Sequence, residues 1–411
     1  MHILFLTDNF PPEGNAPASR TYEHAVRWVQ QGHQVTIITC APNFPEGKVF
    51  EGYSNRLYSS ENLEGIKVVR VKTYITANEG FIKRTLDYLS FMFSGFIASL
   101  FQRRADVVVA TSPQFFCACA GWAVSVVKRR PFIFELRDIW PASITAVGAM
   151  KDSKVIRLLE SLELFLYRRA DAIVSVTNSF KEELIKRGVD ESKIEVVRNG
   201  VDLNCYKPQI KDKKLTVSYD LTNKFVVSYI GTHGMAHGLE HIVTVAERLK
   251  DHDGIRFCFA GGGASREKIV KLVKDRGLSN VVLIDRQPKE TMPKLWSTCD
   301  VSLVPLINNS LFSTVIPSKI FECMAMGIPT IMSVPKGEAT SILLESGAGL
   351  AVDSENVDEI VNAILTLYND PVLYDQYRRN SLSAAKNFSR DVLANDLLSV
   401  LCSVHYRNKD V

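Results

Sequence analysis

Residues 317–329, Pro-Ser-Lys-Ile-Phe-Glu-Cys-Met-Ala-Met-Gly-Ile-Pro, offer an anion site and a carboxylate about one helical turn apart. Pro317 suits the first turn of a helix. The amides of Ser318 and Lys319 are therefore predicted to lie among the unpaired N–H groups there, where the helix dipole favours an anion. The carboxylate of Glu322 can accept both hydroxyls of a ribose. The spacing predicts a nucleotide ligand, although an ordinary buried helix with a surface Lys and Glu would show the same pattern.

The loop after the first predicted strand, residues 9–20, is rich in Pro and Gly and runs into a helix that we expect Ser19 to cap. Such a loop can bring its backbone at Gly14 close to a phosphate or sugar, and Arg20 can pair with an acidic group. An ordinary surface turn has the same composition. A G-x-G-x-x-G fingerprint is missing from the sequence, which disfavours a dinucleotide cofactor.

Three ionisable residues, Glu135, Arg137 and Asp138, stand where an apolar strand ends, just before Trp140 and Pro141. Charged residues at a strand tip either face a binding site or form a structural ion pair, and perturbed groups of this kind cluster at functional sites. Arg137 and Asp138 are therefore candidate site residues, with the ion pair as the alternative.

Three loops in the second half of the chain add further candidates. Residues 231–238, Gly-Thr-His-Gly-Met-Ala-His-Gly, carry two histidines. No carboxylate or thiol at useful spacing completes a zinc site, so polar contact of His233 or His237 with an anion is the better interpretation. The Gly261-Gly-Gly263 run allows either close approach of a ligand or a simple turn. The loop 285–288, which includes Arg286, could read a planar base through its backbone.

Length and composition limit the class of protein. A chain of 411 residues exceeds what one core usually supports, so two domains of roughly 200 residues are expected. The net charge of +4 is too mild for a nucleic-acid-binding protein. The eight cysteines include no C-x-x-C pair, and the first residues read as a core strand rather than a secretory signal. We therefore expect a cytoplasmic protein that binds neither nucleic acid nor a metal.

Residues 86–101 form a largely apolar run that is slightly short for a bilayer span and is interrupted by Asp87 and three serines. Basic residues flank the run at Lys83, Arg84, Arg103 and Arg104. The pattern predicts a helix that is either part of the core or partly immersed in a membrane surface, where its basic flanks would meet anionic lipid headgroups.

Strand-like runs alternate with helical patterns throughout the chain, which predicts an α/β protein with two doubly wound parallel sheets. Strands are expected at 2–7, 35–39, 67–71, 106–111, 132–136, 172–176, 194–197, 225–231, 255–263, 281–285, 301–306 and 328–333. Helices are expected at 19–31, 153–169, 238–250, 264–276, 291–299 and 390–405.

The domain boundary is expected within 199–215, where Asn-Gly, Pro and a Lys/Asp cluster interrupt the apolar periodicity. This gives an N-terminal domain at 1–205 and a C-terminal domain at 206–388. The last segment, 389–411, is predicted as an amphipathic helix that can cross back to the first domain.

The ordered set YIGTHGMAHG, FAGGG, LIDRQP, CDVSLVPL and PSKIFECMAMGIP, preceded by RNGVD, resembles the GT-B glycosyltransferases of the retaining family four. The resemblance covers essentially the whole chain. The segments LTDNFPPEGNAPASR and ELRDIWP resemble the subgroup of bacterial surface-polysaccharide enzymes that includes N-acetyl-L-fucosamine transferases of O-antigen and capsule synthesis.

This resemblance implies a GT-B fold, with two Rossmann-like domains facing a central cleft. It also implies transfer of a sugar with retention of anomeric configuration, without a metal or other cofactor. The subgroup implies a UDP-sugar donor and a lipid-linked, prenyl-diphosphate saccharide acceptor in lipopolysaccharide or capsule synthesis. Such an enzyme is expected to be peripheral on the inner face of the cytoplasmic membrane.

The resemblance also assigns roles to the candidate residues. Catalytic roles are implied for Arg137, Asp138 and Thr314, and acceptor contacts for Arg20 and Asp138. Donor contacts are implied for Gly14, Arg198, Gly231, Thr232, His237, Gly261, Arg286, Ser313, Pro317, Ser318, Lys319 and Glu322.

The family's usual signature has two glutamates separated by seven residues. In this chain the second is Glu322, but the position of the first, eight residues earlier, is occupied by Thr314. The hydroxyls of the donor sugar would lose a carboxylate acceptor, and Thr314, Ser313 and nearby amides would have to replace it. This departure suggests a donor with a different hydroxyl pattern, such as a 6-deoxy amino sugar.

The Arg and Lys that commonly neutralise the diphosphate in the family are replaced by Thr232 and His237. Compensation would have to come from Lys319, from Arg198 or from the start of the helix, because the leaving diphosphate gains charge as the glycosidic bond breaks. Arg137 stands where a histidine near the donor sugar is usual.

Two other functions keep the same architecture. A UDP-sugar 2-epimerase would need acid and base carboxylates around the sugar. A non-catalytic homologue acting as a binding or scaffold subunit would explain the replaced glutamate, arginine and lysine.

Overall fold

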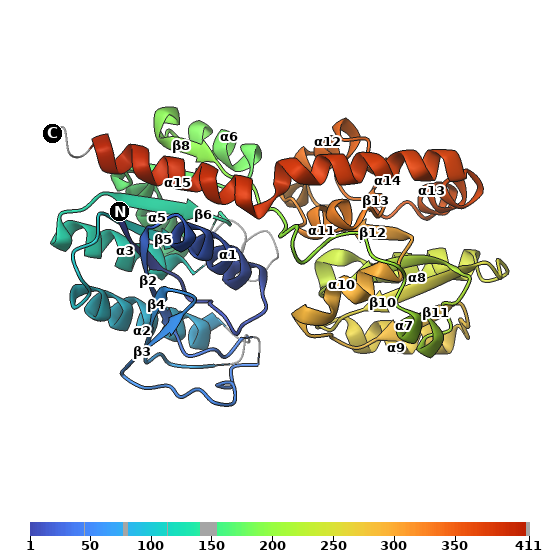
Figure 1. Cartoon of the computed structure of the whole chain (residues 1–411), viewed down its shortest axis with the longest axis horizontal. Helices are drawn as coiled ribbons and strands as arrows, with labels where there is room; N and C mark the ends of the chain where they lie inside the picture. The colour runs from blue at the N-terminus through green and yellow to red at the C-terminus, as the bar shows by residue number, and fades with distance from the viewer. Residues whose placement is uncertain (45, 77–80, 113, 140–153, 408–411) are drawn as a thin grey trace. The chain divides into compact units, whose positions relative to one another are not determined.

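The computed structural model describes residues 1–44, 46–76, 81–112, 114–139 and 154–407, and it divides into two compact units (Figure 1). The first unit comprises Met1–Arg198 and Arg390–Val411, and the second comprises Asn199–Ser389. Each unit has its own sheet and its own core.

An eight-stranded sheet forms the centre of the first unit, in the order β3-β4-β2-β1-β5-β6-β7-β8. Seven strands are parallel, and the edge strand β3 pairs with β4 in the antiparallel sense. The strands are β1 (His2–Leu6), β2 (Gln34–Cys40), β3 (Tyr58–Leu63), β4 (Ile66–Val71), β5 (Val107–Thr111), β6 (Phe132–Leu136), β7 (Ala172–Ser175) and β8 (Ile194–Val196).

Helices cover both faces of this sheet. They are α1 (Ala16–Gln30), α2 (Phe81–Leu100), α3 (Phe115–Lys128), α5 (Lys154–Arg169), α6 (Asn178–Lys186) and α15 (Arg390–Arg407), with a 3₁₀ turn η1 (Glu191–Lys193). Successive side chains of a strand point to opposite faces, which divides the apolar residues into two clusters. One cluster lies under α2, α3, α5 and α6, and the other lies under α1 and α15.

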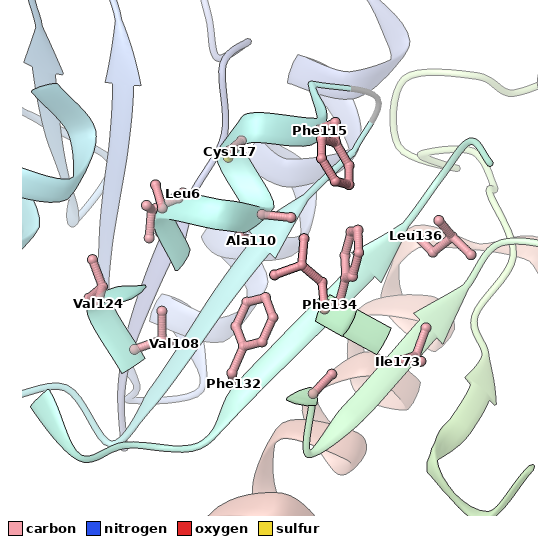
Figure 2. Packing of buried hydrophobic residues seen from close by; sticks show 14 of the residues in the cluster. Leu6, Val108, Ala110, Phe115, Cys117, Val124, Phe132, Phe134, Leu136 and Ile173 are labelled. Carbon is pink, nitrogen blue, oxygen red and sulfur yellow. The ribbon is translucent and has the colours of Figure 1, made fainter. Parts of the chain in front are cut away.

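The first of these clusters is packed closely enough to require a small residue. Figure 2 shows Val108, Ala110, Phe132 and Phe134 on the strands below residues of α3. A β-carbon on Gly121 of α3 would lie 2.5 Å from the β-carbon of Ala110. The helix therefore approaches the sheet more closely than a larger residue would allow.

The second unit contains a six-stranded, fully parallel sheet in the order β11-β10-β9-β12-β13-β14. Its strands are β9 (Phe225–Ile230), β10 (Ile255–Ala260), β11 (Val281–Ile284), β12 (Val301–Pro305), β13 (Thr330–Ser333) and β14 (Gly349–Val352). Its helices are α7 (Lys213–Ser218), α8 (Leu239–Arg248), α9 (Arg266–Asp275), α10 (Met292–Ser297), α11 (Lys319–Met326), α12 (Glu338–Glu345), α13 (Val357–Asn369) and α14 (Pro371–Ala385). Its 3₁₀ turns are η2 (Met235–His237), η3 (Lys289–Thr291), η4 (Ser310–Thr314) and η5 (Lys386–Phe388).

The strand order of the second sheet reverses between β9 and β12. The helix after β9, α8, packs on one face of the sheet, whereas α11, which follows β12, packs on the other. In open α/β sheets, ligands bind outside the carboxyl ends of the strands at such a reversal. The loops 231–238 and 306–318 are therefore where the topology places a ligand site.

The predicted parallel α/β architecture is confirmed, but several element boundaries differ. The helix expected at 19–31 begins at Ala16, because the side chain of Asn15 caps it by accepting a hydrogen bond from the amide of Ala18 at 2.9 Å. The capping role expected of Ser19 is thus wrong. Strands β3 and β14 were not expected, and the start of the helix expected at 153 lies outside the described residues.

Helix α15 packs along α1 within the first unit (Figure 1). Trp28 of α1 donates from its indole N–H to the carbonyl oxygen of Ala394 at 2.9 Å. Arg390, at the first turn of α15, is buried and pairs with Glu23 at 2.6 Å. The final helix of the chain is therefore held on the first sheet by apolar packing and by a nearly buried ion pair.

Candidate active site

The loops after β9 and β10 are locked together by their glycines. The amide of His233 donates to the carbonyl oxygen of Gly262 at 2.9 Å, and the amide of Ser265 donates to that of His233 at 2.8 Å. A β-carbon on Gly261 would lie only 1.9 Å from the carbonyl oxygen of Gly231, and Gly261 has φ +140°. Packing between the two loops thus explains the glycine at 261, and the structure gives its predicted donor contact no separate support.

Lys319 brings a positive charge to the end of β9. Its Nζ lies 3.9 Å from the centre of the Tyr229 ring, a cation–π contact. It would also lie 2.8 Å from a β-carbon on Gly231. Any larger residue at 231 would therefore displace the lysine, so the glycine leaves room for the ammonium group at the reversal point.

Helix α11 begins where the sequence predicted a helix start. Ser318 is the N-cap residue, and the first hydrogen bonds run from Ile320 N to the carbonyl of Pro317 and from Phe321 N to that of Ser318. The amides of Ser318 and Lys319 thus precede the first bonded turn. Together with the lysine side chain, they form a positively polarised helix start.

Burial determines the charge of this region. It lowers the pKa of Lys319 to about 8. Burial and the nearby Lys319 cation lower the pKa of His237 to about 4, and burial and Arg266 lower that of His233 to about 4. At neutral pH both histidines are therefore neutral, whereas Lys319 is mostly charged.

The two histidines of the loop are not equivalent. His233 is fully buried, and its ring centre lies 5.6 Å from that of Tyr229. The anion contact proposed for His233 is therefore replaced by a packing role. His237 is half-buried, with Nδ1 3.4 Å from the carbonyl oxygen of Pro305, and is the accessible histidine of the pair.

Glu322 lies on α11, one turn after Lys319, and is half-buried. The indole N–H of Trp296 on α10 donates to its Oε2 at 3.0 Å. The structure thus brings together, at one end of the second sheet, four of the residues predicted to contact the nucleotide-sugar donor: Gly231, Ser318, Lys319 and Glu322. Thr232 and Arg286 are exposed on neighbouring loops, and Pro317 is half-buried before α11.

Ser313 and Thr314 lie in the 3₁₀ turn η4, after β12. The Ser313 hydroxyl donates to the carbonyl of Ser310 at 2.7 Å, and the Thr314 hydroxyl donates to that of Leu311 at 2.8 Å. Because each hydroxyl donates its proton within the turn, its oxygen keeps lone pairs that can accept a hydrogen bond. A β-carbon on Gly337 would lie 2.0 Å from the Ser313 carbonyl oxygen, so η4 is packed directly on the start of α12.

In the first unit, Arg20 occupies the interior rather than a binding surface. It is 0% exposed and pairs with Glu135, which is 1% exposed, at 2.8 Å. It also donates to the carbonyl oxygens of Arg198 at 2.6 Å and Val197 at 2.9 Å. Arg20 therefore makes structural contacts inside the first unit instead of the predicted contact with the acceptor substrate. For Glu135, the structure supports the alternative of a structural ion pair.

Arg137 and Asp138 follow β6 beside this ion pair. The backbone amides of both residues donate to Ser112 Oγ, at 2.7 and 3.2 Å, and the Arg137 guanidinium donates to the carbonyl of Pro17 at 3.2 Å. Burial lowers the pKa of Arg137 to about 10. Both side chains are half-buried, so they stay candidates for contact with substrate.

Other predicted residues of the first unit are less informative. Gly14 is exposed, and a β-carbon there would meet no atom within 4 Å. Arg198 is half-buried, and its carbonyl is bound by Arg20. Trp140 and Pro141 lie outside the described residues.

Two side chains that contact the site were not expected from the sequence. Tyr229 supports Lys319 from within β9, and Trp296 holds Glu322 from α10. Trp296 stands 26 residues before Glu322, so no local spacing links them. Within the part of the chain that the structure describes, no group of three or more His, Cys, Asp or Glu residues is arranged to hold a metal ion.

Comparison with known families accounts for both units. Residues 18–204 match the model described as Glycosyltransferase Family 4, and residues 212–384 match the model described as Glycosyl transferases group 1. The chain is 27% identical over 377 residues to the Escherichia coli K12 protein named "Putative colanic acid biosynthesis glycosyl transferase WcaI", covering 89% of this chain and 91% of that protein.

A second relative is the N-acetylgalactosamine-N,N'-diacetylbacillosaminyl-diphospho-undecaprenol 4-alpha-N-acetylgalactosaminyltransferase of Campylobacter jejuni. It is 24% identical over 255 residues, which cover 61% of this chain and 64% of that protein.

Solved structures share the fold over the whole chain. Sucrose-phosphate synthase from Thermosynechococcus elongatus superposes with a TM-score of 0.79 at 15% identity, covering 99% of each chain. Anabaena HepE, in a complex with UDP-glucose, superposes with a TM-score of 0.72 at 17% identity, covering 98% of this chain and 100% of that one. With a Glycosyltransferase Family 4 domain followed by a Glycosyl transferases group 1 domain, the protein belongs to the glycosyltransferases of GT-B fold.

Proposed function

We propose that this glycosyltransferase moves a sugar from a UDP-sugar to a lipid-linked saccharide, with retention at the anomeric carbon, in the synthesis of a bacterial surface polysaccharide. One observation carries the proposal: Lys319 and Glu322 stand one turn apart on α11, beside the end of β9, where the strand order reverses. Anabaena HepE was solved in complex with UDP-glucose, and the name of the Campylobacter relative specifies an undecaprenol-diphosphate-linked substrate. These two similar proteins support the proposed kinds of substrate.

The diphosphate would be bound at the start of α11. Its charge would meet the amides of Ser318 and Lys319 and the Lys319 ammonium, which lies beside Gly231 at the end of β9. His237, neutral at pH 7, would add a hydrogen-bond donor rather than a second cation. The ribose hydroxyls would donate to the Glu322 carboxylate one turn later. Lys319 and the start of α11 would thus supply the positive charge that is missing because Thr232 and His237 replace the family's usual Arg and Lys.

Catalysis on this site would depend on position and charge rather than on a protein nucleophile. As the glycosidic bond breaks, negative charge grows on the leaving diphosphate, and the preorganised Lys319 and helix start would stabilise it. The leaving phosphate oxygen would accept the proton of the attacking acceptor hydroxyl on the same face of the sugar, which preserves the anomeric configuration. No metal or other cofactor takes part in this scheme.

The donor sugar is proposed to be a 6-deoxy amino sugar such as N-acetyl-L-fucosamine. Where the family commonly has a carboxylate, this chain presents the hydroxyl oxygens of Ser313 and Thr314, with both protons donated within η4. Two neutral acceptors suit a sugar with fewer hydroxyls and an acetamido N–H. Arg137 and Asp138 are proposed to contact the donor sugar or the acceptor.

The membrane surface is the proposed location of the acceptor, and α2 offers a face for it. Helix α2 and the residue after it expose large apolar side chains: Leu86, Phe93, Ile97, Leu100 and Phe101, of which Phe101 is 81% exposed. Lys128 of α3 donates to the carbonyl of Gln102 at 3.0 Å, which brings the exposed Val126 and Val127 alongside. Arg103 and Arg104 are exposed beside them and would meet anionic headgroups at the inner face of the membrane. None of the described helices is both long and apolar enough to cross a membrane.

The transfer reaction is tested by incubating the purified protein with a panel of UDP-sugars, including UDP-N-acetyl-L-fucosamine, and a prenyl-diphosphate-linked saccharide. Formation of an elongated lipid-linked product is the expected result, with its anomeric configuration read by NMR. Epimerisation of the UDP-sugar in the absence of acceptor would favour the 2-epimerase alternative, and UDP binding without turnover would favour a scaffold subunit.

Glu322→Ala should abolish transfer in a folded protein, and unchanged donor affinity would contradict the ribose contact.

Membrane association is tested by flotation with phosphatidylglycerol vesicles and with phosphatidylcholine vesicles. Phe101→Ser combined with charge reversal at Arg103 and Arg104 should reduce binding to the anionic vesicles. Val217→Ser, which changes a residue of the second unit that is 71% exposed, is the matched control and should leave binding unchanged. Equal binding of all three proteins would place the α2 face outside the membrane contact.

A further inference from the structure

The indole of Trp296 is held so that its one polar atom meets Glu322. Trp296 is 0% exposed and packs in the apolar cluster between the sheet, α10 and α11. Its Nε1 donates to Glu322 Oε2 at 3.0 Å across 26 residues of sequence. A buried tryptophan normally finds a partner for its N–H, and backbone carbonyls are the common choice. Here the partner is instead an ionisable side chain on the ligand-binding helix.

The consequence for Glu322 is a loss of freedom. An exposed glutamate samples several rotamers, and ordering it on ligand binding costs side-chain entropy. The indole is rigid and buried, so its hydrogen bond fixes the position of Oε2 and restrains the plane of the carboxylate. An ionised carboxylate offers about four acceptor sites, and the indole occupies one of them. Two donors from a ligand would use further acceptor sites of the carboxylate.

A diol is the ligand group that benefits from a carboxylate fixed in this way. The 2′- and 3′-hydroxyls of a ribose are adjacent donors with a set spacing, whereas a 2′-deoxyribose supplies only one of them. A carboxylate that is free to rotate can bind ribose or 2′-deoxyribose with a similar free-energy cost. A carboxylate held in one orientation gains more from the diol, because both of its hydrogen bonds form without ordering the side chain.

We propose that Trp296 is a positioning residue that sets the preference of the site for ribonucleoside diphosphates over 2′-deoxyribonucleoside diphosphates. This inference rests on the proposed function, in which Glu322 binds the ribose of a UDP-sugar. It adds a residue from a different helix to that contact. It also gives a structural reason why α10 packs a tryptophan, rather than a purely aliphatic residue, against α11.

The test compares UDP with 2′-deoxy-UDP by isothermal titration calorimetry on the full-length chain. For the unaltered protein, UDP should bind about tenfold or more tightly than 2′-deoxy-UDP, the ratio expected from one hydrogen bond to a charged group. Trp296→Phe keeps an aromatic ring but removes the donor, and it should reduce the ratio to about threefold or less. Glu322→Gln should also reduce the ratio, and adding Trp296→Phe to it should cause no further reduction.

The matched control is Trp28→Phe, which removes the indole N–H bond to Ala394 in the first unit and should leave the UDP ratio unchanged. Replacing Trp296 with benzothienylalanine, which has sulfur in place of the N–H and nearly the same shape, serves if the phenylalanine variant does not fold. A folded variant at 296 that keeps the full ratio, while Glu322→Gln loses it, overturns the inference and leaves the proposed function intact. Failure of the unaltered protein to bind UDP overturns the proposed function and the inference with it.

Discussion

Neutralising Lys319 is the most direct test of the proposed diphosphate contact. In Lys319→Met the aliphatic stem is kept and the charge is lost. A hydrogen bond between charged groups contributes about 1.5–3 kcal/mol, so the Kd for UDP at pH 7 should rise about 10- to 150-fold. The stem can still pack on Tyr229, so the free energy of unfolding should change little. Lys274→Met, an exposed lysine on α9, is the control and should bind UDP normally.

The pH dependence of binding gives an independent measure of the same contact. Burial lowers the pKa of Lys319 to about 8 in the ligand-free protein, so the ammonium is mostly charged at pH 7 and mostly neutral at pH 9. The diphosphate favours the charged form and is itself fully ionised above its own pKa of about 6. UDP affinity should therefore be nearly constant from pH 6.5 to 7.5 and fall by up to about tenfold per pH unit above 8.

Titration calorimetry of UDP at several pH values between 7 and 9.5 measures this profile. The Lys319→Met protein should show weak binding with no decline above pH 8, because the group that titrates is gone. The reasoning is refuted if the variant binds UDP as tightly as the unaltered protein at pH 7, or if both proteins lose affinity in parallel above pH 8. In either case the diphosphate does not rest on this ammonium.

Three further predictions concern the fold that supports the site. Arg20→Met strands the buried Glu135 carboxylate and should lower the free energy of unfolding by about 3–5 kcal/mol in urea titrations; a loss below 1 kcal/mol would contradict the structural role. Gly261→Ala should cost about 1–3 kcal/mol because its β-carbon meets the Gly231 carbonyl, whereas Gly14→Ala should change the Tm hardly at all; equal shifts in Tm would refute the interlocked loops. Burial raises the folded-state pKa of Asp87 to about 7, above its unfolded value near 4, so ionisation disfavours the folded state and stability should fall as pH rises from about 4 to about 7. Asp87→Asn should flatten that slope, and an unchanged pH profile of unfolding would argue against this assignment.

The parallel architecture was predictable because most strands are short apolar runs between helical patterns, and that signal is local. The strands that escaped prediction lack it. β3, Tyr-Ser-Ser-Glu-Asn-Leu, is a polar edge strand that depends on its pairing with β4. β14, Gly-Leu-Ala-Val, is too short to show a period. Asn15 rather than Ser19 caps α1, which begins at Ala16, and Pro17 fits within the first helical turn.

The residues of the candidate site also differ in whether local sequence or long-range packing determines their positions. Ser318, Lys319 and Glu322 were predictable because a helix start and a one-turn spacing are visible in sequence. The burial of Arg20 depends on Glu135, 115 residues later, and the orientation of Glu322 depends on Trp296. Gly261 was open to two interpretations until the neighbouring loop was seen to fill the space beside it. Contacts made by tertiary packing join residues that are far apart in the sequence, so no local spacing pattern predicts them.

The close approach of Gly337 to the Ser313 carbonyl has a consequence for how sugar selectivity can change. The backbone of η4 lies so close to Gly337 that a β-carbon there would be 2.0 Å from the Ser313 carbonyl oxygen, which restricts movement of this turn toward α12. Its two inward-donated hydroxyl protons also keep the 3₁₀ turn in one shape. Under the proposed donor contact, variation in the accepted sugar would arise by exchanging the side chains at 313 and 314 on a constant backbone. Libraries aimed at new donors should randomise those two positions and preserve the glycine.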